Sequence, residues 1–201
     1  MDEASAQFWL EVIAAVAVAV WAIGHWLVRR TAAHLEAKPL ESAIEVDGEP
    51  AELRLRAAAT FARGQQGSTL QRLRIEDVDD NGVRWTSSLP IVRYRGEMTF
   101  ARSGPGRTRI AWRAAAQAPA LRAARRFTLA GAVVVLALFV LLRDFALPSP
   151  NPAVRGQVFQ MVQAIHVLWP PFLYVGLARS LRRQVAADLE RVAHNLPHAL
   201  A

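Results

Sequence analysis

The stretch VRYRGEMTFARSGPGRTRIAWRA, residues 92–114, decides the fold of the middle of this chain. Apolar or small residues alternate with mostly charged ones on both sides of a Gly-Pro-Gly segment at 104–106. Alternation with a period of two is typical of a β-strand with one buried face, and Gly-Pro-Gly is typical of a turn. The stretch therefore predicts a β-hairpin with one apolar face and one charged face.

The register of this hairpin follows from keeping the apolar residues on one face. The pairs that do so are Phe100 with Ile110, Met98 with Trp112 and Glu97 with Arg113. This register leaves Gly104, Pro105 and Gly106 as a three-residue turn. It also places a charge pair on the face opposite the apolar residues.

The residues around the hairpin complete a small α+β unit. Alternation and turn residues predict strands at 43–47, 70–78, 83–87, 91–102 and 108–114. Pro50 opens a helix, because its missing N–H costs nothing in a first turn, and the helix runs to about Arg63 and stops at Gly64. The apolar face of the sheet is expected to pack on this helix.

The charged face of the sheet carries a candidate basic patch. Its members are Arg93, Arg95, Arg109 and Arg113. Such a patch suits anionic lipid headgroups if the domain lies on a membrane. The alternative is an ordinary solvated sheet face.

Three long apolar runs flank this unit, at 8–28, 127–142 and 157–178. Crossing a hydrocarbon core of about 30 Å takes about 20 apolar residues, and arginines bounding the short second run can reach the interface. The predicted fold class is therefore an α+β membrane protein. It has three transmembrane helices and a small cytoplasmic antiparallel-sheet-plus-helix domain inserted between spans 1 and 2.

Basic residues set the predicted orientation, because cytoplasmic segments carry the excess of Arg and Lys. Arginines cluster at 29–30, 122–126 and 179–183, whereas the N-terminus and the Pro-rich loop have few. The chain is expected to be a multi-pass protein of the cell inner membrane, with its N-terminus outside and its C-terminus in the cytoplasm.

The predicted organisation follows the chain in order. Span 1 is 1–30, and the cytoplasmic α+β domain with a connecting helix follows at 31–126. Span 2 is 127–145, and a Pro-rich outer loop at 146–156 joins it to span 3 at 157–178. An amphipathic tail helix occupies 179–201.

The third span carries unusual polarity. A polar side chain recurs every three residues and is followed by two prolines, and this candidate intramembrane interface comprises Gln157, Gln160, Gln163, His166, Pro170 and Pro171. Polar residues in a span commonly face other helices rather than lipid. We expect part of the stripe to meet another integral membrane subunit. Packing against spans 1 and 2, and a quinone or ion site, are the alternatives.

The apolar residues of the tail recur at helical spacing, at Leu181, Val185, Leu189, Val192 and Leu196. This stripe is consistent with a helix that covers the cytoplasmic domain, lies on the membrane surface or binds a partner.

Cofactor and catalytic signals are sparse. The chain contains no cysteine, which excludes disulfide scaffolds and thiolate zinc sites. His25 and His166 are predicted at different depths in the membrane, which argues against haem ligation between them. No cofactor, metal or catalytic residue is predicted, because no known catalytic motif is present.

The α+β unit resembles a known superfamily in its order of elements. The segments that carry the resemblance are Val-Asp-Gly-Glu-Pro at 46–50, Tyr-Arg-Gly-Glu-Met-Thr-Phe at 94–100 and Gly-Arg-Thr-Arg-Ile-Ala-Trp at 106–112. Residues 40–115 are similar to the START-like helix-grip superfamily of polyketide-cyclase type, truncated and fused to membrane spans. The resemblance implies a sheet that grips a helix, with a pocket for a lipid or polyketide.

The leading functional hypothesis is a non-catalytic accessory or assembly subunit of a bacterial inner-membrane protein complex. A membrane-tethered lipid- or isoprenoid-binding module of helix-grip type is the main alternative. A haem- or quinone-associated subunit of a membrane oxidoreductase is a weaker one. The expected partners are other integral membrane subunits and membrane lipids. The formal net charge of +7 does not by itself predict nucleic-acid binding, and no nucleic-acid partner is expected.

Overall fold

The computed structural model describes residues 3–63, 73–87, 89–151 and 170–199. The chain divides into two compact units, a helical unit of Met1–Thr31 with Leu121–Val175 and a sheet unit of Ala32–Ala120 with Gly176–Ala201. The helix α1 (Glu3–Ala37), the helix α3 (Pro119–Leu141) and the helix α5 (Pro170–Asn195) each continue from one unit into the other.

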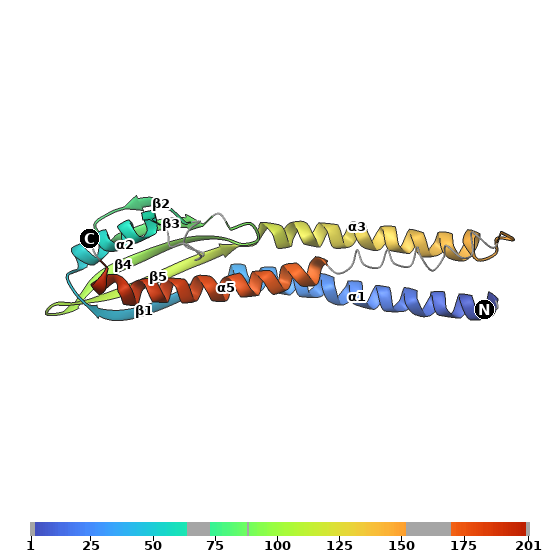
Figure 1. Ribbon diagram of the computed structural model, residues 1–201, viewed down its shortest axis with the longest axis horizontal. Helices are drawn as coiled ribbons and strands as arrows, with labels where there is room; N and C mark the ends of the chain where they lie inside the picture. Colours follow the sequence, from blue (N-terminus) through green and yellow to red (C-terminus); the bar gives the residue numbers. More distant parts are fainter. Residues whose placement is uncertain (1–2, 64–72, 88, 152–169, 200–201) are drawn as a thin grey trace. The chain divides into compact units, whose positions relative to one another are not determined.

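The sheet unit is built on five antiparallel strands in the order β1-β5-β4-β3-β2 (Figure 1). The strands are β1 (Leu40–Asp47), β2 (Leu73–Val78), β3 (Gly82–Ser87), β4 (Arg93–Gly104) and β5 (Arg107–Gln117). β2 to β5 form a meander, and β1 closes it by pairing with β5. The structure thus confirms an α+β fold with an antiparallel sheet.

The predicted hairpin register is confirmed. β4 and β5 pair Phe100 with Ile110, and the other two predicted pairs also form. The predicted three-residue turn is wrong, because the register shifts between Arg102 and Gly104 and Gly104 pairs directly with Arg107. A bulge at Ser103 leaves the two-residue turn Pro105–Gly106, in which Gly106 has a φ of 67° that glycine adopts without strain.

One helix of the sheet unit, α2 (Pro50–Arg63), has the predicted bounds. It begins at Pro50 and buries Leu53, Ala57 and Phe61 at a spacing of four residues. The ring of Phe61 lies 6.4 Å from that of Trp85 on β3, between centroids. α2 therefore packs on the apolar face of the sheet, as the alternation predicts.

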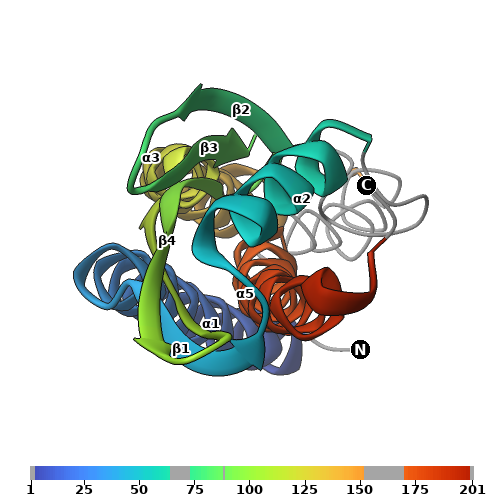
Figure 2. The same cartoon turned by 90° about the vertical axis from the view of Figure 1, so that its left-hand side faces the viewer.

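The part of α5 from Gly176 onward also belongs to the sheet unit, and Figure 2 shows α5 on the same side of the sheet as α2. Its apolar stripe is buried at Val185, Leu189 and Val192, and the short 3-10 helix η4 (Leu196–His198) adds Leu196. Of the three alternatives for the tail, the structure shows the one in which it covers the domain.

The predicted boundary between a third span and a tail at 178–179 is not an element boundary. α5 runs without a break from Pro170 to Asn195, and its first two residues are Pro170 and Pro171. The remainder of the predicted third span, 157–169, lies outside the described residues.

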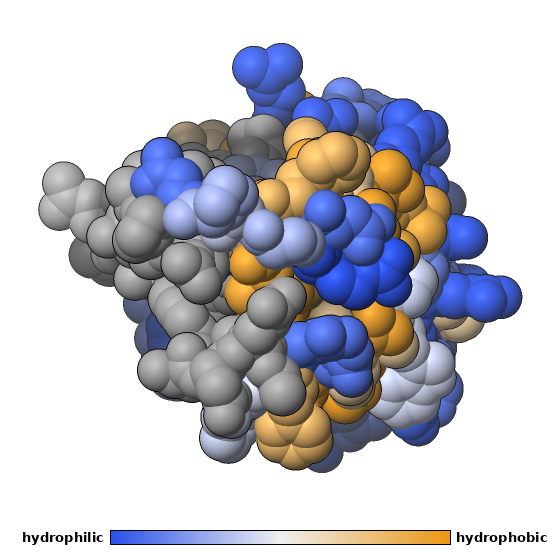
Figure 3. Space-filling view, turned by 90° about the vertical axis from the view of Figure 1, so that its right-hand side faces the viewer, coloured by the Kyte–Doolittle hydropathy of each residue, from blue (hydrophilic) through white to orange (hydrophobic). Residues whose placement is uncertain are grey.

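In the helical unit, α1 and α3 pack as an antiparallel pair (Figure 1). The core joins Leu10 and Ala17 of α1 to Val135 and Phe139 of α3, and it extends into the π-helical turn η2 (Leu142–Ala146). Among the described residues, two helices are long and apolar enough to cross a membrane, within Gln7–Ala37 and Pro119–Ala146. At the end where α1 begins, hydrophobic and hydrophilic residues lie side by side (Figure 3).

Candidate functional site

The outer face of the sheet, which points away from α2, carries a row of alternating charges. Cross-strand pairing aligns Asp77, Arg84, Glu97, Arg113 and Glu41, one from each strand. Arg84 forms an ion pair with Asp77, and Arg113 Nε lies 3.0 Å from Glu41 Oε1. We call this row the charge ladder. Each arginine in it has carboxylates on both neighbouring strands, so its charge is compensated within the sheet.

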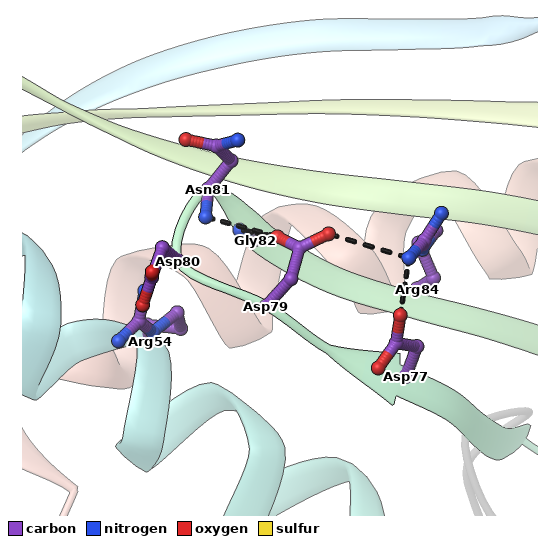
Figure 4. A network of polar contacts seen from close by, with 7 residues as sticks. All are labelled: Arg54, Asp77, Asp79, Asp80, Asn81, Gly82 and Arg84. Atoms are coloured by element: carbon purple, nitrogen blue, oxygen red, sulfur yellow. Dashed lines mark hydrogen bonds and ion pairs between the residues drawn. The ribbon is translucent and has the colours of Figure 1, made fainter.

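The β2–β3 turn continues the ladder at one edge (Figure 4). Asp79 accepts hydrogen bonds of 2.9 Å from the backbone N–H groups of Asn81 and Gly82, and it lies 3.3 Å from Arg84. These backbone donors, helped by the arginines, hold the pKa of Asp79 below its ordinary value. Asp80 faces Arg54 of α2 at 3.7 Å. The acidic turn is therefore already neutralised by arginines.

The next row on the outer face is different, because its strand positions hold no carboxylate. Arg74 of β2 pairs with Thr86 of β3, and Thr86 pairs with Arg95 of β4. Arg93 lies two residues before Arg95 on the same face and is paired with Gln117. These residues line a hollow of about 550 Å³ at the end of the sheet. We call Arg74, Thr86, Arg93 and Arg95 the arginine row.

The predicted basic patch is thus divided between two environments. Arg113 belongs to the charge ladder, and Arg109 lies opposite Glu45 of β1. Arg95 contacts Glu76 at 3.1 Å but remains 73% exposed, and Arg93 is exposed next to it.

Sequence reasoning missed Arg74 and Thr86. The strand that holds Arg74 was predicted, but its register with β3 was not. That register contains an irregularity between Ile75 and Asp77, so simple alternation does not predict which residue lies beside Thr86.

Large side chains fill the inner face of the sheet, where the helix-grip resemblance implies a pocket. Trp85, Tyr94, Met98 and Ile110 are at most 1% exposed. The Tyr94 hydroxyl and the Trp85 Nε1 have no hydrogen-bond partner among the described residues. Burial raises the pKa of Tyr94 to about 12. Within the described residues, the inner face is a packed core in which these two polar atoms lack a partner.

In the helical unit, three polar groups meet between α1 and α3. His25 Nδ1 lies 3.0 Å from Thr128 Oγ1, and Trp21 Nε1 donates to the Thr128 carbonyl at 2.7 Å. The Thr128 hydroxyl donates to the Arg125 carbonyl at 2.7 Å, so it accepts from His25. This is the interhelical polar contact expected of a histidine in a helix pair.

A mainly apolar cavity of about 370 Å³ lies beside this contact. α1 contributes Trp21 and Gly24, and α3 contributes Thr128 and Val134 among others. Pro170 and Pro171, two of the predicted interface residues, also line it. The other predicted interface residues, Gln157, Gln160, Gln163 and His166, lie outside the described residues.

Metal ligands do not gather in the part of the chain that the structure describes: it contains no group of three or more His, Asp or Glu side chains suited to an ion.

Comparisons with known proteins add little. No family model and no curated protein matches the sequence. One similar solved structure is a conserved protein of unknown function from Enterococcus faecalis, with 12% identity and a TM-score of 0.22, over 68% of this chain and 97% of that chain. A TM-score this low does not establish a shared fold, and the helix-grip resemblance stays a prediction.

Proposed function

We propose that the chain is a non-catalytic accessory or assembly subunit of a membrane protein complex, in keeping with the sequence-based hypothesis of a bacterial inner membrane. The observation that carries the proposal is the apolar surface that α1 and α3 leave uncovered. In the most apolar 18-residue stretch of each helix, only 17% of α1 and 11% of α3 is buried. An exposed apolar surface of this kind suits lipid or another membrane chain.

The ends of the helix pair support a membrane position. Exposed aromatic residues mark both ends of the pair: Phe8, Trp9 and Phe145 at one, and Trp26 and Phe127 at the other. Of these, the two tryptophans carry the argument, because the amphipathic rings of Trp and Tyr are enriched at both membrane interfaces. Arg30 also lies over the ring of Trp26, 5.0 Å from its centroid, where the apolar part of α1 ends.

Chain connectivity supports a third crossing. α3 leaves the sheet unit after Ala120, and the chain rejoins that unit at Gly176. If α3 crosses the membrane, the chain must cross back before Gly176. The sheet unit and the C-terminus then share one side of the membrane, which the arginine distribution assigns to the cytoplasm.

The cavity in the helical unit favours a second candidate, the binding of a lipid or isoprenoid chain. Its lining is mostly apolar, and it includes small residues such as Gly24 and Ala130. Both a side chain from a neighbouring helix and an acyl or isoprenoid chain suit such a lining. The experiment must therefore distinguish a protein occupant from a lipid occupant.

Site-specific photo-crosslinking makes this distinction in the full-length protein. A photoreactive amino acid replaces Val134, which lines the cavity, and in a matched variant it replaces Leu136, which does not. Both residues are exposed on α3, at 63% and 51%. We expect a discrete protein adduct from position 134 in the native membrane, and a weaker or absent one from position 136.

The pair Gln160→Leu and Gln163→Leu provides a second readout. We expect the double variant to insert in the membrane but to lose copurifying partners in mild detergent. A lipid adduct alone at position 134, with unchanged copurification of the double variant, would reject the assembly proposal in favour of lipid binding.

A further inference from the structure

The contrast between two neighbouring rows of the outer sheet face points to a ligand. In the charge ladder, arginines and carboxylates alternate across all five strands. In the arginine row, the residues paired across β2, β3 and β4 are Arg74, Thr86 and Arg95. A solvated sheet face of mixed charge explains the ladder, but it does not explain the concentration of positive charge one row away.

We propose that the arginine row binds a phosphate group, carried by a lipid headgroup or by a free phosphate compound. Neighbouring strands lie about 4.8 Å apart, so Arg74 and Arg95 flank Thr86 at about 10 Å between their backbones. Long guanidinium side chains from both flanks reach a common point above Thr86. Guanidinium groups bind phosphate oxygens in bidentate fashion, and the threonine hydroxyl supplies a further donor.

The charges around the hollow favour an anion. Arg74, Arg93 and Arg95 line it without a carboxylate among its lining residues. Glu76 contacts Nη2 of Arg95 and offsets one of the three charges. The row therefore retains a net positive charge, which a phosphate group of charge about −1 to −2 would neutralise.

The position of the row in the chain favours a lipid headgroup as the source. Gln117, which pairs with Arg93, is followed at Pro119 by the start of α3. The apolar run of α3 begins at Phe127, about 12 Å along the helix from Pro119. If α3 crosses a membrane, this short connection along the chain makes a lipid headgroup the favoured source of the phosphate. The proposal depends on the sheet alone, so it stands whether or not the assembly proposal holds.

The test compares two double variants of the full-length protein that remove equal charge from the same sheet face. Arg74→Gln with Arg93→Gln alters the arginine row, whereas Arg109→Gln with Arg113→Gln alters arginines that lie opposite glutamates. Titration calorimetry with inorganic phosphate measures the free anion. Native mass spectrometry after delipidation measures retention of phosphatidic acid against phosphatidylcholine.

We expect the first double variant to weaken binding by about fivefold for each arginine removed, and the second to change it less than twofold. Thr86→Val should weaken binding without changing the net charge. Retention of phosphatidic acid identifies a headgroup site, whereas binding of inorganic phosphate alone identifies a free phosphate compound as the ligand. Equal weakening by both double variants, or no binding of either probe by the wild type, overturns the proposal.

Discussion

At Gly96 of β4, a methyl group would lie 2.4 Å from Cζ2 of Trp85 and 3.0 Å from the carbonyl oxygen of Arg113. Trp85 is fully buried, so its ring has no free space in which to move. We expect Gly96→Ala to destabilise the sheet unit by about 1–3 kcal/mol, as overpacking does. Gly104→Ala, on the same strand with no atom within 4 Å, is the control and should change stability little. Denaturant unfolding in detergent measures both, and equal effects would refute the packing explanation.

Asp79 makes the stability of the β2–β3 turn depend on pH. Its folded-state pKa is lowered, chiefly because two backbone N–H groups donate to the carboxylate. The stabilisation is therefore present above the ordinary pKa of about 3.9 and is lost as the pH falls through the lower folded value. We expect Asp79→Asn to lower the melting temperature at pH 7 and to differ little from wild type near pH 2. Asp80→Asn, at a fully exposed side chain of the same turn, is the control and should change the melting temperature at pH 7 little.

At the scale of elements, Arg56 of α2 hydrogen-bonds to the C-terminal residues and holds them against the sheet unit. Its Nη1 donates to the carbonyl oxygens of Leu196 at 3.2 Å and Pro197 at 2.6 Å. We expect Arg56→Met, which keeps the apolar stem, to destabilise this contact by about 1.5–3 kcal/mol and to speed carboxypeptidase digestion. Arg63→Met, an exposed arginine on the same helix, serves as the control. Unchanged digestion of the Arg56 variant would show that the contact does not hold the terminus.

Local patterns predict the elements better than they predict how distant elements meet. Alternation gave the register of β4 with β5, and Pro50 gave the start of α2, because both depend on neighbouring residues. The Ser103 bulge was missed, since a Gly-Pro-Gly segment permits turns of two or three residues. The arginine row was only half predicted, because its Arg74 depends on the irregular pairing of β2 with β3.

The tail shows the same limit. Its apolar stripe predicts a helix with a buried face, but periodicity does not say which surface buries it. The structure shows that the stripe is buried within the sheet unit, where Arg182 of the same helix also donates to the Lys38 carbonyl at 2.7 Å. That contact joins residues far apart in the sequence, and neither residue carries a local signal for it.

At the scale of the whole molecule, the sheet unit is assembled from two stretches of chain separated by the helical unit. Ala32–Ala120 supplies the sheet and α2, and Gly176–Ala201 supplies the helix that completes the fold. The sheet unit therefore cannot complete its fold until the apolar segments between these two stretches have been synthesised. Whether those segments cross the membrane twice decides which side holds the C-terminus.

Because the chain contains no cysteine, single introduced cysteines report topology without interference. We expect Gln7→Cys and Ser149→Cys to react with a membrane-impermeant maleimide in intact cells. Ala51→Cys in α2 and Ala187→Cys in α5 should react only after the cells are permeabilised, because both residues belong to the sheet unit. All four should react in lysed cells, since each site is at least partly exposed. Equal reactivity of positions 149 and 187 in intact cells would mean that the chain does not cross between them, and the multi-pass topology would then be wrong.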